Sequence, residues 1–179
     1  MIKKVLYATD LSPFTPHMLL HVEALCTHFD ARLHVVHAVS PIGELASAVL
    51  RSRCSEMVKQ EVLRTTHITG LLETIREEIY EIFANSIYSG TQLIERISEI
   101  VVAPDSAANL ILFEAERSGA DLIVVGSHGI ESIDGHILGS VAAKVLQLAK
   151  VPVFMIPMMD PANMLDQGRW LSSSRWWTN

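Results

Sequence analysis

The sequence predicts an α/β domain, an open sheet of five parallel strands with helices on both faces. Short apolar runs alternate with segments whose apolar residues are spaced three or four positions apart, which is typical of strands and helices in a parallel sheet. The composition agrees, because 49% hydrophobic and 19% charged residues suit a sheet that is buried on both faces. The connections between the strands are expected to be right-handed.

The apolar runs give the expected elements in order. Strands are expected at about 3–9, 32–38, 97–102, 121–125 and 151–156. The first helix is expected to have Ser12 as its N-cap and Pro13 as its first residue. Its buried stripe consists of Met18, Val22, Leu25, Cys26 and Phe29. Later helices are expected over about 44–86 with a break at 65–70, over 106–118 with a stop at Gly119, and over 140–149.

Composition and charge exclude several classes of protein. The formal net charge of −6 argues against extended nucleic-acid binding, which needs a basic face. No run reaches the roughly 18 apolar residues of a membrane helix, and the N-terminus enters a strand without a signal-peptide pattern. Cys26 and Cys54 do not form a C-x-x-C pair, which suits thiols in a reducing compartment. We therefore expect a cytoplasmic protein.

A glycine-rich segment after the fourth strand is the most informative part of the chain. Gly126 and Gly129 are followed, nine residues later, by Gly139–Ser140 at the start of the last helix. Glycine permits φ > 0 and a close approach of ligand to backbone. A helix N-terminus presents unpaired N–H groups and a positive dipole end to an anion. The segment predicts a site for the phosphates of a nucleotide; the alternative is that the glycines merely turn the chain.

The common phosphate-binding patterns, Gly-x4-Gly-Lys-Ser/Thr and Gly-x-Gly-x-x-Gly, are absent. The spacing Gly-x2-Gly-x9-Gly-Ser instead resembles the ATP-binding signature of the universal stress protein family. Residues 3–12, 33–38, 120–129 and 151–157 are similar to strand segments of that family, in the same order. The resemblance implies a Rossmann-like, universal-stress-type nucleotide-binding domain over residues 1–157, a role in stress response, and a Trp-containing extension over 158–179.

The resemblance also implies a site for ATP, or for AMP or ADP, at the ends of the strands. The predicted binding residues are Asp10, Ala38, Gly126, Ser127, His128, Gly129, Gly139, Ser140 and Val141. Asp10 would accept hydrogen bonds from ribose hydroxyls or help to hold Mg²⁺ or Mn²⁺ on the phosphates; alternatively it stabilises the following turn, since Asp-x-Ser readily forms Asx turns. Ala38 would contact the adenine edge through its backbone. The glycine loop, with the Ser140 hydroxyl, would bind the phosphates.

Independent support comes from position, because Asp10, Ala38 and Gly126 all fall at the carboxyl ends of predicted strands. Open parallel sheets bind their ligands at that edge, where the strand order reverses. One feature is adverse: Glu131 and Asp134 lie between the glycines, where many members of the family carry Lys or Arg. These carboxylates predict weaker nucleotide binding, or binding that depends on a divalent ion.

Two histidine pairs raise a second metal hypothesis. His17 and His21 are four residues apart on the first helix, a spacing that can place two imidazoles on one face. No Cys or carboxylate completes the set at a matching interval, so solvated surface histidines are the favoured interpretation. His34 and His37 are three apart in a strand and are expected to point to opposite faces.

The function that follows is an ATP-binding regulatory protein that acts through dimerisation and partner proteins. The alternative is a dimeric interaction module of the same fold that has lost nucleotide binding. No nucleophile–base pair or suitably placed arginine is evident, so at most weak ATP hydrolysis is expected. The resemblance implies a homodimer in which strand 151–156 pairs with its copy.

The extension holds all the tryptophans of the chain, interleaved with arginines: Trp170, Trp176, Trp177, Arg169 and Arg175. Trp and Arg are enriched where proteins bind one another. The extension is therefore expected to contact a neighbouring subunit or a partner; a disordered tail or a cloning remnant is the alternative.

Overall fold

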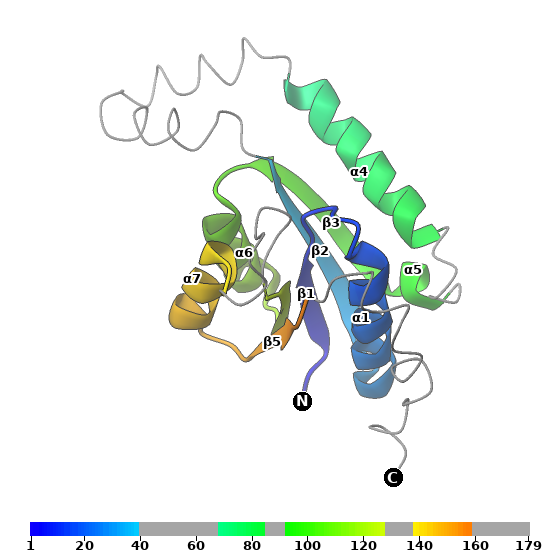
Figure 1. The fold of residues 1–179 in the computed structure, drawn as a ribbon. Helices are drawn as coiled ribbons and strands as arrows, with labels where there is room; N and C mark the ends of the chain where they lie inside the picture. The colour runs from blue at the N-terminus through cyan, green and yellow to red at the C-terminus, as the bar shows by residue number, and fades with distance from the viewer. Residues whose placement is uncertain (40–67, 85–91, 128–137, 159–179) are drawn as a thin grey trace, which may run out of the picture.

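A computed structural model of the chain describes residues 1–39, 68–84, 92–127 and 138–158. It contains one five-stranded parallel sheet with the order β3-β2-β1-β4-β5 (Figure 1). The strands are β1 (Lys4–Ala8), β2 (Arg32–Val39), β3 (Ile97–Pro104), β4 (Leu122–Gly126) and β5 (Val153–Ile156). The helices are α1 (Thr15–Phe29), α4 (Ile68–Ala84), α5 (Gln92–Arg96), α6 (Ala107–Ser118) and α7 (Ser140–Leu148). The predicted fold class is confirmed.

Alternating residues of the strands build two separate cores. Tyr7 of β1 and Val124 of β4 pack with residues of α1, α4 and α5 on one face of the sheet. Leu6 and Ile123, their neighbours in sequence, pack with α6 and α7 on the other face. Figure 1 shows these two helical layers on opposite sides of the strands. Because successive strand residues point to opposite faces, apolar runs without polar alternation produce a sheet covered on both sides.

The ends of α6 follow the sequence prediction closely. Ser106 is the N-cap residue, with extended backbone angles, and Gly119 ends the helix in the left-handed region at φ 66°. The N–H of Gly119 donates to the last carbonyls of the helix, at Ala115 and Glu116. A residue with a Cβ is strained at such a φ, so glycine is the natural stop.

The start of α1 differs from the prediction. Ser12 and Pro13 do not begin the helix; its N-cap is Phe14, and Pro16 occupies the first helical turn. Residues 10–12 instead form a tight turn, in which the Ser12 hydroxyl accepts a hydrogen bond from the N–H of Phe14 at 3.3 Å. The first helical turn has no internal acceptor for its N–H groups, so Pro16 fits there as well as Pro13 would have.

Other differences are small. Gly70, which was expected in a helix break, lies inside α4, and the short helix α5 was not predicted. The part of the predicted helix 44–86 that precedes residue 68 lies outside the described residues. None of the helices that the structure describes is long and apolar enough to cross a membrane.

Candidate functional site

The strand order places a topological switch between β1 and β4. From β1 the chain adds β2 and β3 on one side, and β4 and β5 lie on the other side. Connections therefore diverge above the carboxyl ends of β1 and β4, and ligands of open parallel sheets bind in the crevice that results. The predicted residues Asp10, Gly126 and Ser127 follow or end these two strands.

The carboxyl ends of β1 and β2 are joined by hydrogen bonds. The Thr9 N–H donates to the carbonyl of Val36 at 3.0 Å, and His37 Nδ1 lies 2.8 Å from the Thr9 carbonyl oxygen. Thr9 was not among the residues predicted from the sequence, and His37 was considered there only as a metal ligand. A polar residue directly after an apolar strand, opposite a histidine on the next strand, was the available signal.

Asp10 begins a turn with an unusual backbone. Its Oδ1 accepts the N–H of Ser12 at 3.1 Å, and Thr9 Oγ1 accepts the N–H of Leu11 at 3.1 Å. Leu11 has φ 57°, a left-handed conformation that is uncommon for a bulky residue and often found at functional sites. The Asx turn considered for Asp10 is therefore present. Its side chain is nevertheless exposed, and Oδ2 has no hydrogen-bond partner within the described residues.

Ala38 lies near the end of β2, in register with Ala103 of β3 and only partly buried. The carbonyl of Val36 points toward β1, where it accepts from Thr9. Backbone groups two residues apart in a strand point to the same side, so the N–H and C=O of Ala38 also face the β1 side. Strand pairing with β1 ends at the pair Ala8 and Val36, so the N–H and C=O of Ala38 lie beyond the last residue of β1.

The two ends of the glycine-rich segment are held together. Gly126 ends β4 in register with Ile156, and the Ser127 N–H donates to the Ile156 carbonyl at 2.8 Å. The Gly139 N–H donates to the Ser127 carbonyl at 2.8 Å, and the Ser127 hydroxyl accepts the N–H of Met158 at 3.0 Å. Ser127 and Gly139, which flank this segment, therefore lie next to each other beside the switch.

The same hydrogen bonds reduce the set of phosphate donors. The N–H groups of Ser127 and Gly139 are already used within the chain. Ser140 and Val141 open α7 and are exposed; no side chain among the described residues caps this helix. The first N–H groups of a helix have no acceptor within it, so α7 directs unpaired donors outward. Predicted residues His128 and Gly129, and the acidic Glu131 and Asp134, lie outside the described residues.

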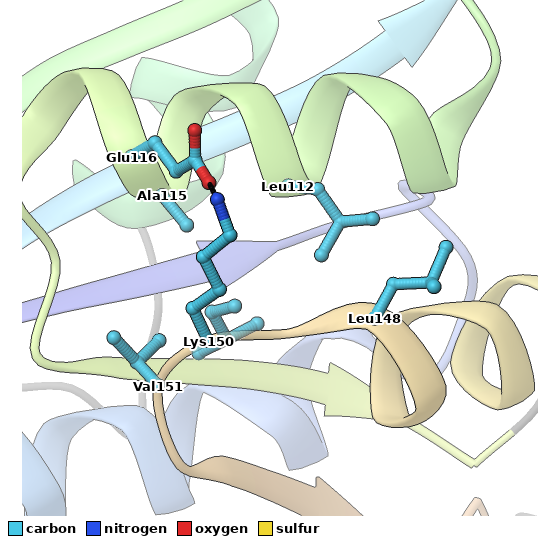
Figure 2. Close-up of a pocket in the computed structure, with 7 residues that line it drawn as sticks. Leu112, Ala115, Glu116, Leu148, Lys150 and Val151 are labelled. Atoms are coloured by element: carbon cyan, nitrogen blue, oxygen red, sulfur yellow. Dashed lines mark ion pairs between the residues drawn. The ribbon is translucent and has the colours of Figure 1, made fainter.

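A small cavity lies elsewhere, between α6, the end of α7 and the segment before β5 (Figure 2). Its volume is about 60 Å³, and it is lined by Leu112, Ala115, Glu116, Ile123, Leu148, Lys150 and Val151. Lys150 forms an ion pair with Glu116 across it. Lys150 and Val151 precede β5, away from the carboxyl edge, and the volume is far below the few hundred Å³ of a typical ligand site. The cavity is not the nucleotide site.

A polar cluster, the α6 ion network, joins α6 to the sheet; it consists of the buried His34 and Glu114 and the partly exposed Glu99 and Arg117. His34 Nε2 lies 2.9 Å from Glu114 Oε2, and both side chains are almost fully buried. Arg117 donates to both oxygens of Glu114, from Nε at 2.9 and 2.8 Å, and to Glu99 at 2.7 Å. Burial alone would raise the pKa of Glu114, but hydrogen bonds from Arg117 and His34 outweigh it and hold that pKa below its usual range.

His37 takes no part in this network; its ring contacts Thr9 instead. His34 and His37 thus contact different groups, in agreement with the expectation that they point to opposite faces of the strand. Since the charges of the network are paired with one another, we assign it to stability rather than to ligand binding.

An open parallel sheet with this strand order defines a Rossmann-like α/β protein. The chain belongs to the Universal stress protein family, whose sequence model matches residues 1–157.

Individual relatives agree with the family. Universal stress protein YxiE of Bacillus subtilis is 28% identical over 166 residues, which cover 87% of this chain and 99% of that protein. The solved structure of protein MJ0577 of Methanocaldococcus jannaschii matches with a TM-score of 0.55 and 25% identity, over 89% of this chain and 99% of that one. A universal stress protein in complex with cAMP shares the fold, with a TM-score of 0.54 and 20% identity over 88% and 98% of the two chains.

Proposed function

We propose that this protein binds an adenine nucleotide, ATP in the first instance, at the carboxyl edge between β1 and β4. In this proposal it acts in the cytoplasm as a stress-response regulator, through its dimer and through partner proteins. Family membership supports the proposal, and a solved relative of the same fold is a complex with cAMP. Family and fold do not by themselves identify the ligand, so the ligand is inferred from the residues of the site.

The main support for the proposal is the N-terminus of α7, which no side chain among the described residues caps. The Ser127–Gly139 hydrogen bond of 2.8 Å holds this helix end beside the carboxyl end of β4. Ser140 and Val141 are exposed there, with the positive end of the helix dipole behind them. A hydrogen bond to a charged group contributes about 1.5–3 kcal/mol, so a few such donors give micromolar binding even after the cost of association.

Asp10 and Ala38 would hold the nucleoside end. Asp10 is exposed and uses Oδ1 for its turn, which leaves Oδ2 for a ribose hydroxyl or for a metal ion on the phosphates. The backbone of Ala38, beyond the end of β1, offers an N–H and a C=O to the adenine edge. Together with the start of α7, these groups lie at one edge of the sheet, where the proposed nucleotide would bind.

The divalent ion in the proposal is Mg²⁺ or Mn²⁺, bound mainly by the phosphates. Oxygen ligands are the preference of both ions. Glu131 and Asp134 in the loop would repel a bare triphosphate, and the ion would offset that repulsion. Calorimetry should show tighter ATP binding with either ion. Glu131→Lys should tighten binding and make it less dependent on metal.

The main test compares Asp10→Asn with Asp105→Asn. Asn keeps an oxygen that can accept the Ser12 N–H, so Asp10→Asn should preserve the turn and remove only the charge. Asp105 is a matched control, because it is exposed, follows β3, and also accepts a local hydrogen bond, from the N–H of the next residue, Ser106, at 2.6 Å. We expect ATP affinity to fall about tenfold, or about 1.4 kcal/mol, for Asp10→Asn and to stay unchanged for Asp105→Asn.

Calorimetry with ATP, ADP, AMP and cAMP on ligand-stripped protein would rank the nucleotides. Equal affinities for adenosine and ATP would mean that α7 does not contact phosphate. Absence of any binding at millimolar nucleotide with Mg²⁺ present would reject the proposal.

A dimeric interaction module without nucleotide is the second candidate. It is favoured by the loss of two predicted donors, since the N–H groups of Ser127 and Gly139 already donate within the chain. The acidic residues of the loop favour it too. Mass spectrometry of small molecules released from freshly purified protein separates the candidates, because a co-purified adenine nucleotide argues against this one.

For either candidate we propose a homodimer formed by β5 and the residues before it, 151–156. β5 is an edge strand of the sheet and pairs on one side with β4. Met155 is 39% exposed on this edge, and an unpaired strand edge invites pairing with another chain. Light scattering at tens of micromolar should give the mass of two chains; a monomer would contradict the proposal.

Residues 158–179 are proposed to contact the neighbouring subunit or a partner protein. A variant truncated after Met158 should still fold, because it keeps all the residues of the two described cores. Oligomerisation or partner binding should weaken. If neither changes, the extension has no part in assembly.

A further inference from the structure

We infer that His17 and His21 on α1 form a chelating site for a divalent first-row ion that prefers nitrogen ligands: Cu²⁺, Ni²⁺ or Zn²⁺. This site is separate from the nucleotide and from the Mg²⁺ or Mn²⁺ on its phosphates. From the sequence, these were expected to be solvated surface histidines, yet both rings are half-buried and lie against each other.

The spacing of the rings fits a shared ion. The ring centroids are 4.9 Å apart, with the ring planes at 83°. A metal–nitrogen bond of about 2.0–2.1 Å puts an ion about 3.2 Å from each ring centroid. With nitrogen–metal–nitrogen angles of about 90–109°, two chelating rings then have centroids about 4.5–5.2 Å apart. The observed separation lies inside this interval, so the spacing of the two rings is compatible with a shared ion.

The helix itself fixes the pair. Residues four apart on an α-helix are neighbours on one face, with Cβ atoms about 5–6 Å apart. Both histidines lie in the first half of a 15-residue helix that packs on the sheet through Met18 and Val22. The ligands are therefore preorganised, which reduces the entropic cost of binding an ion.

The choice of ion follows from the ligands. Imidazole suits Zn²⁺, Cu²⁺ and Ni²⁺, whereas Mg²⁺ and Mn²⁺ favour oxygen. Within the described residues no group of three or more His, Cys, Asp or Glu side chains gathers around one point. The described part of the chain thus supplies two ligands, and water can complete the coordination, as at sites that keep open positions.

The test uses tag-free, nucleotide-free protein, titrated with CuCl₂, NiCl₂ and ZnCl₂ in separate calorimetric experiments. We expect a site of one ion per chain, with affinity in the order Cu²⁺ > Ni²⁺ and Cu²⁺ > Zn²⁺. Excess Mg²⁺ should not displace the ion. The Cu²⁺ spectrum by electron paramagnetic resonance should show coupling to two imidazole nitrogens.

Three variants assign the site. His17→Phe keeps a ring packed against His21 but cannot bind metal, and His21→Gln removes the second ligand. Each should weaken metal binding at least about tenfold. Loss of an outer hydrogen-bond partner of a metal ligand already weakens binding by about this much, and loss of a ligand should cost no less. His28→Gln, on the same helix, is the control and should leave the affinity unchanged. Circular dichroism verifies that all three variants fold.

Two results would overturn the inference. One is absence of Cu²⁺, Ni²⁺ and Zn²⁺ binding by the wild-type protein at hundreds of micromolar. The other is equal binding by wild type, His17→Phe and His21→Gln, which would place the ion on other histidines. Neither depends on nucleotide binding, so failure of the proposed function would leave this test intact.

Discussion

The α6 ion network and the carboxyl edge at β1 and β4 are both polar, but their polar groups are used differently. In the network, Glu114 is buried and its two oxygens accept from Arg117 and contact His34. At the carboxyl edge, one carboxylate oxygen of Asp10 accepts a hydrogen bond within a turn. The first N–H groups of α7 are not capped by any side chain among the described residues. Groups satisfied by one another hold the fold, whereas exposed groups with unused hydrogen-bonding capacity can receive a ligand.

This difference has an energetic basis. A buried charge without its partner keeps its full desolvation cost, so breaking the network should reduce stability strongly. An exposed N–H exchanges water for ligand at little cost to the fold. Substitutions at the two regions should therefore separate stability from binding, and the following predictions test that separation.

The largest effect is expected for Glu114→Ala. The substitution leaves His34 buried without its close partner and removes the main partner of Arg117. Breaking a buried pair of this kind should lower the free energy of unfolding by about 3 kcal/mol. Urea denaturation measures the loss. Nucleotide affinity of the folded protein should stay within about twofold of wild type.

The chain contains a matched control for this substitution. Glu73 and Arg76 on α4 form the same i,i+3 pair as Glu114 and Arg117, but both side chains are substantially exposed. Glu73→Ala should change the free energy of unfolding by no more than about 0.5 kcal/mol. Equal losses at the two positions would show that burial of the network contributes nothing.

The network also predicts a dependence on acid. The pKa of Glu114 is held below its ordinary value in the folded protein, so unfolding would raise its affinity for protons. The associated stability is fully present above the unfolded pKa of about 4.5 and is lost as pH falls through the lowered folded pKa. Asp121 should likewise contribute stability that is lost in acid, because hydrogen bonds from the backbone N–H groups of Lys3 and Lys4 lower its pKa. Denaturation midpoints between pH 6 and 3 should fall less steeply for Glu114→Gln than for wild type.

At the carboxyl edge, Val141→Asp should act in the opposite way. A carboxylate in the first turn of α7 interacts favourably with the helix dipole, so stability should hold or rise by a few tenths of a kcal/mol. The same charge stands where the phosphates are proposed to bind. We expect ATP affinity to fall about tenfold, equivalent to about 1.4 kcal/mol. Calorimetry and urea denaturation on one preparation measure both effects.

Leu146, in the same helix, supplies the control for Val141→Asp. It is 42% exposed, close to the 37% of Val141, but lies near the opposite end of α7. Leu146→Asp adds the same charge away from the proposed phosphates and should leave ATP affinity unchanged. If both variants lose affinity equally, the N-terminus of α7 is not the phosphate site.

Much of the fold could be predicted because local signals agreed with one another. Unbroken apolar runs marked β1 and β4, and Gly119 marked the end of α6. The start of α1 could not, since two prolines, Pro13 and Pro16, were both compatible with a first helical turn. The tertiary arrangement of the Asp10 turn decided between them.

The candidate site was predictable in position and less so in detail. Strand ends located Asp10, Ala38 and Gly126 at one edge, but the pairing of the Gly139 N–H with Ser127 depends on how β4, α7 and β5 meet. The network was missed altogether. Its only sequence signal was Glu114 at a position of the apolar stripe of α6, and a single sequence does not show that His34 lies opposite.

The smallest predicted effect concerns Gly119, a glycine of structure rather than of the proposed loop. Its φ of 66° strains any other residue, and a Cβ built there meets nothing within 4 Å. Gly119→Ala should therefore cost only the backbone strain, about 1 kcal/mol, and lower the melting temperature by about 2–4 °C. ATP affinity should be unchanged, because Gly119 precedes β4 at the amino edge of the sheet, away from Gly126 and α7. A large loss of affinity would mean that the position of β4 controls the site, and that stability and binding are not separable in this protein.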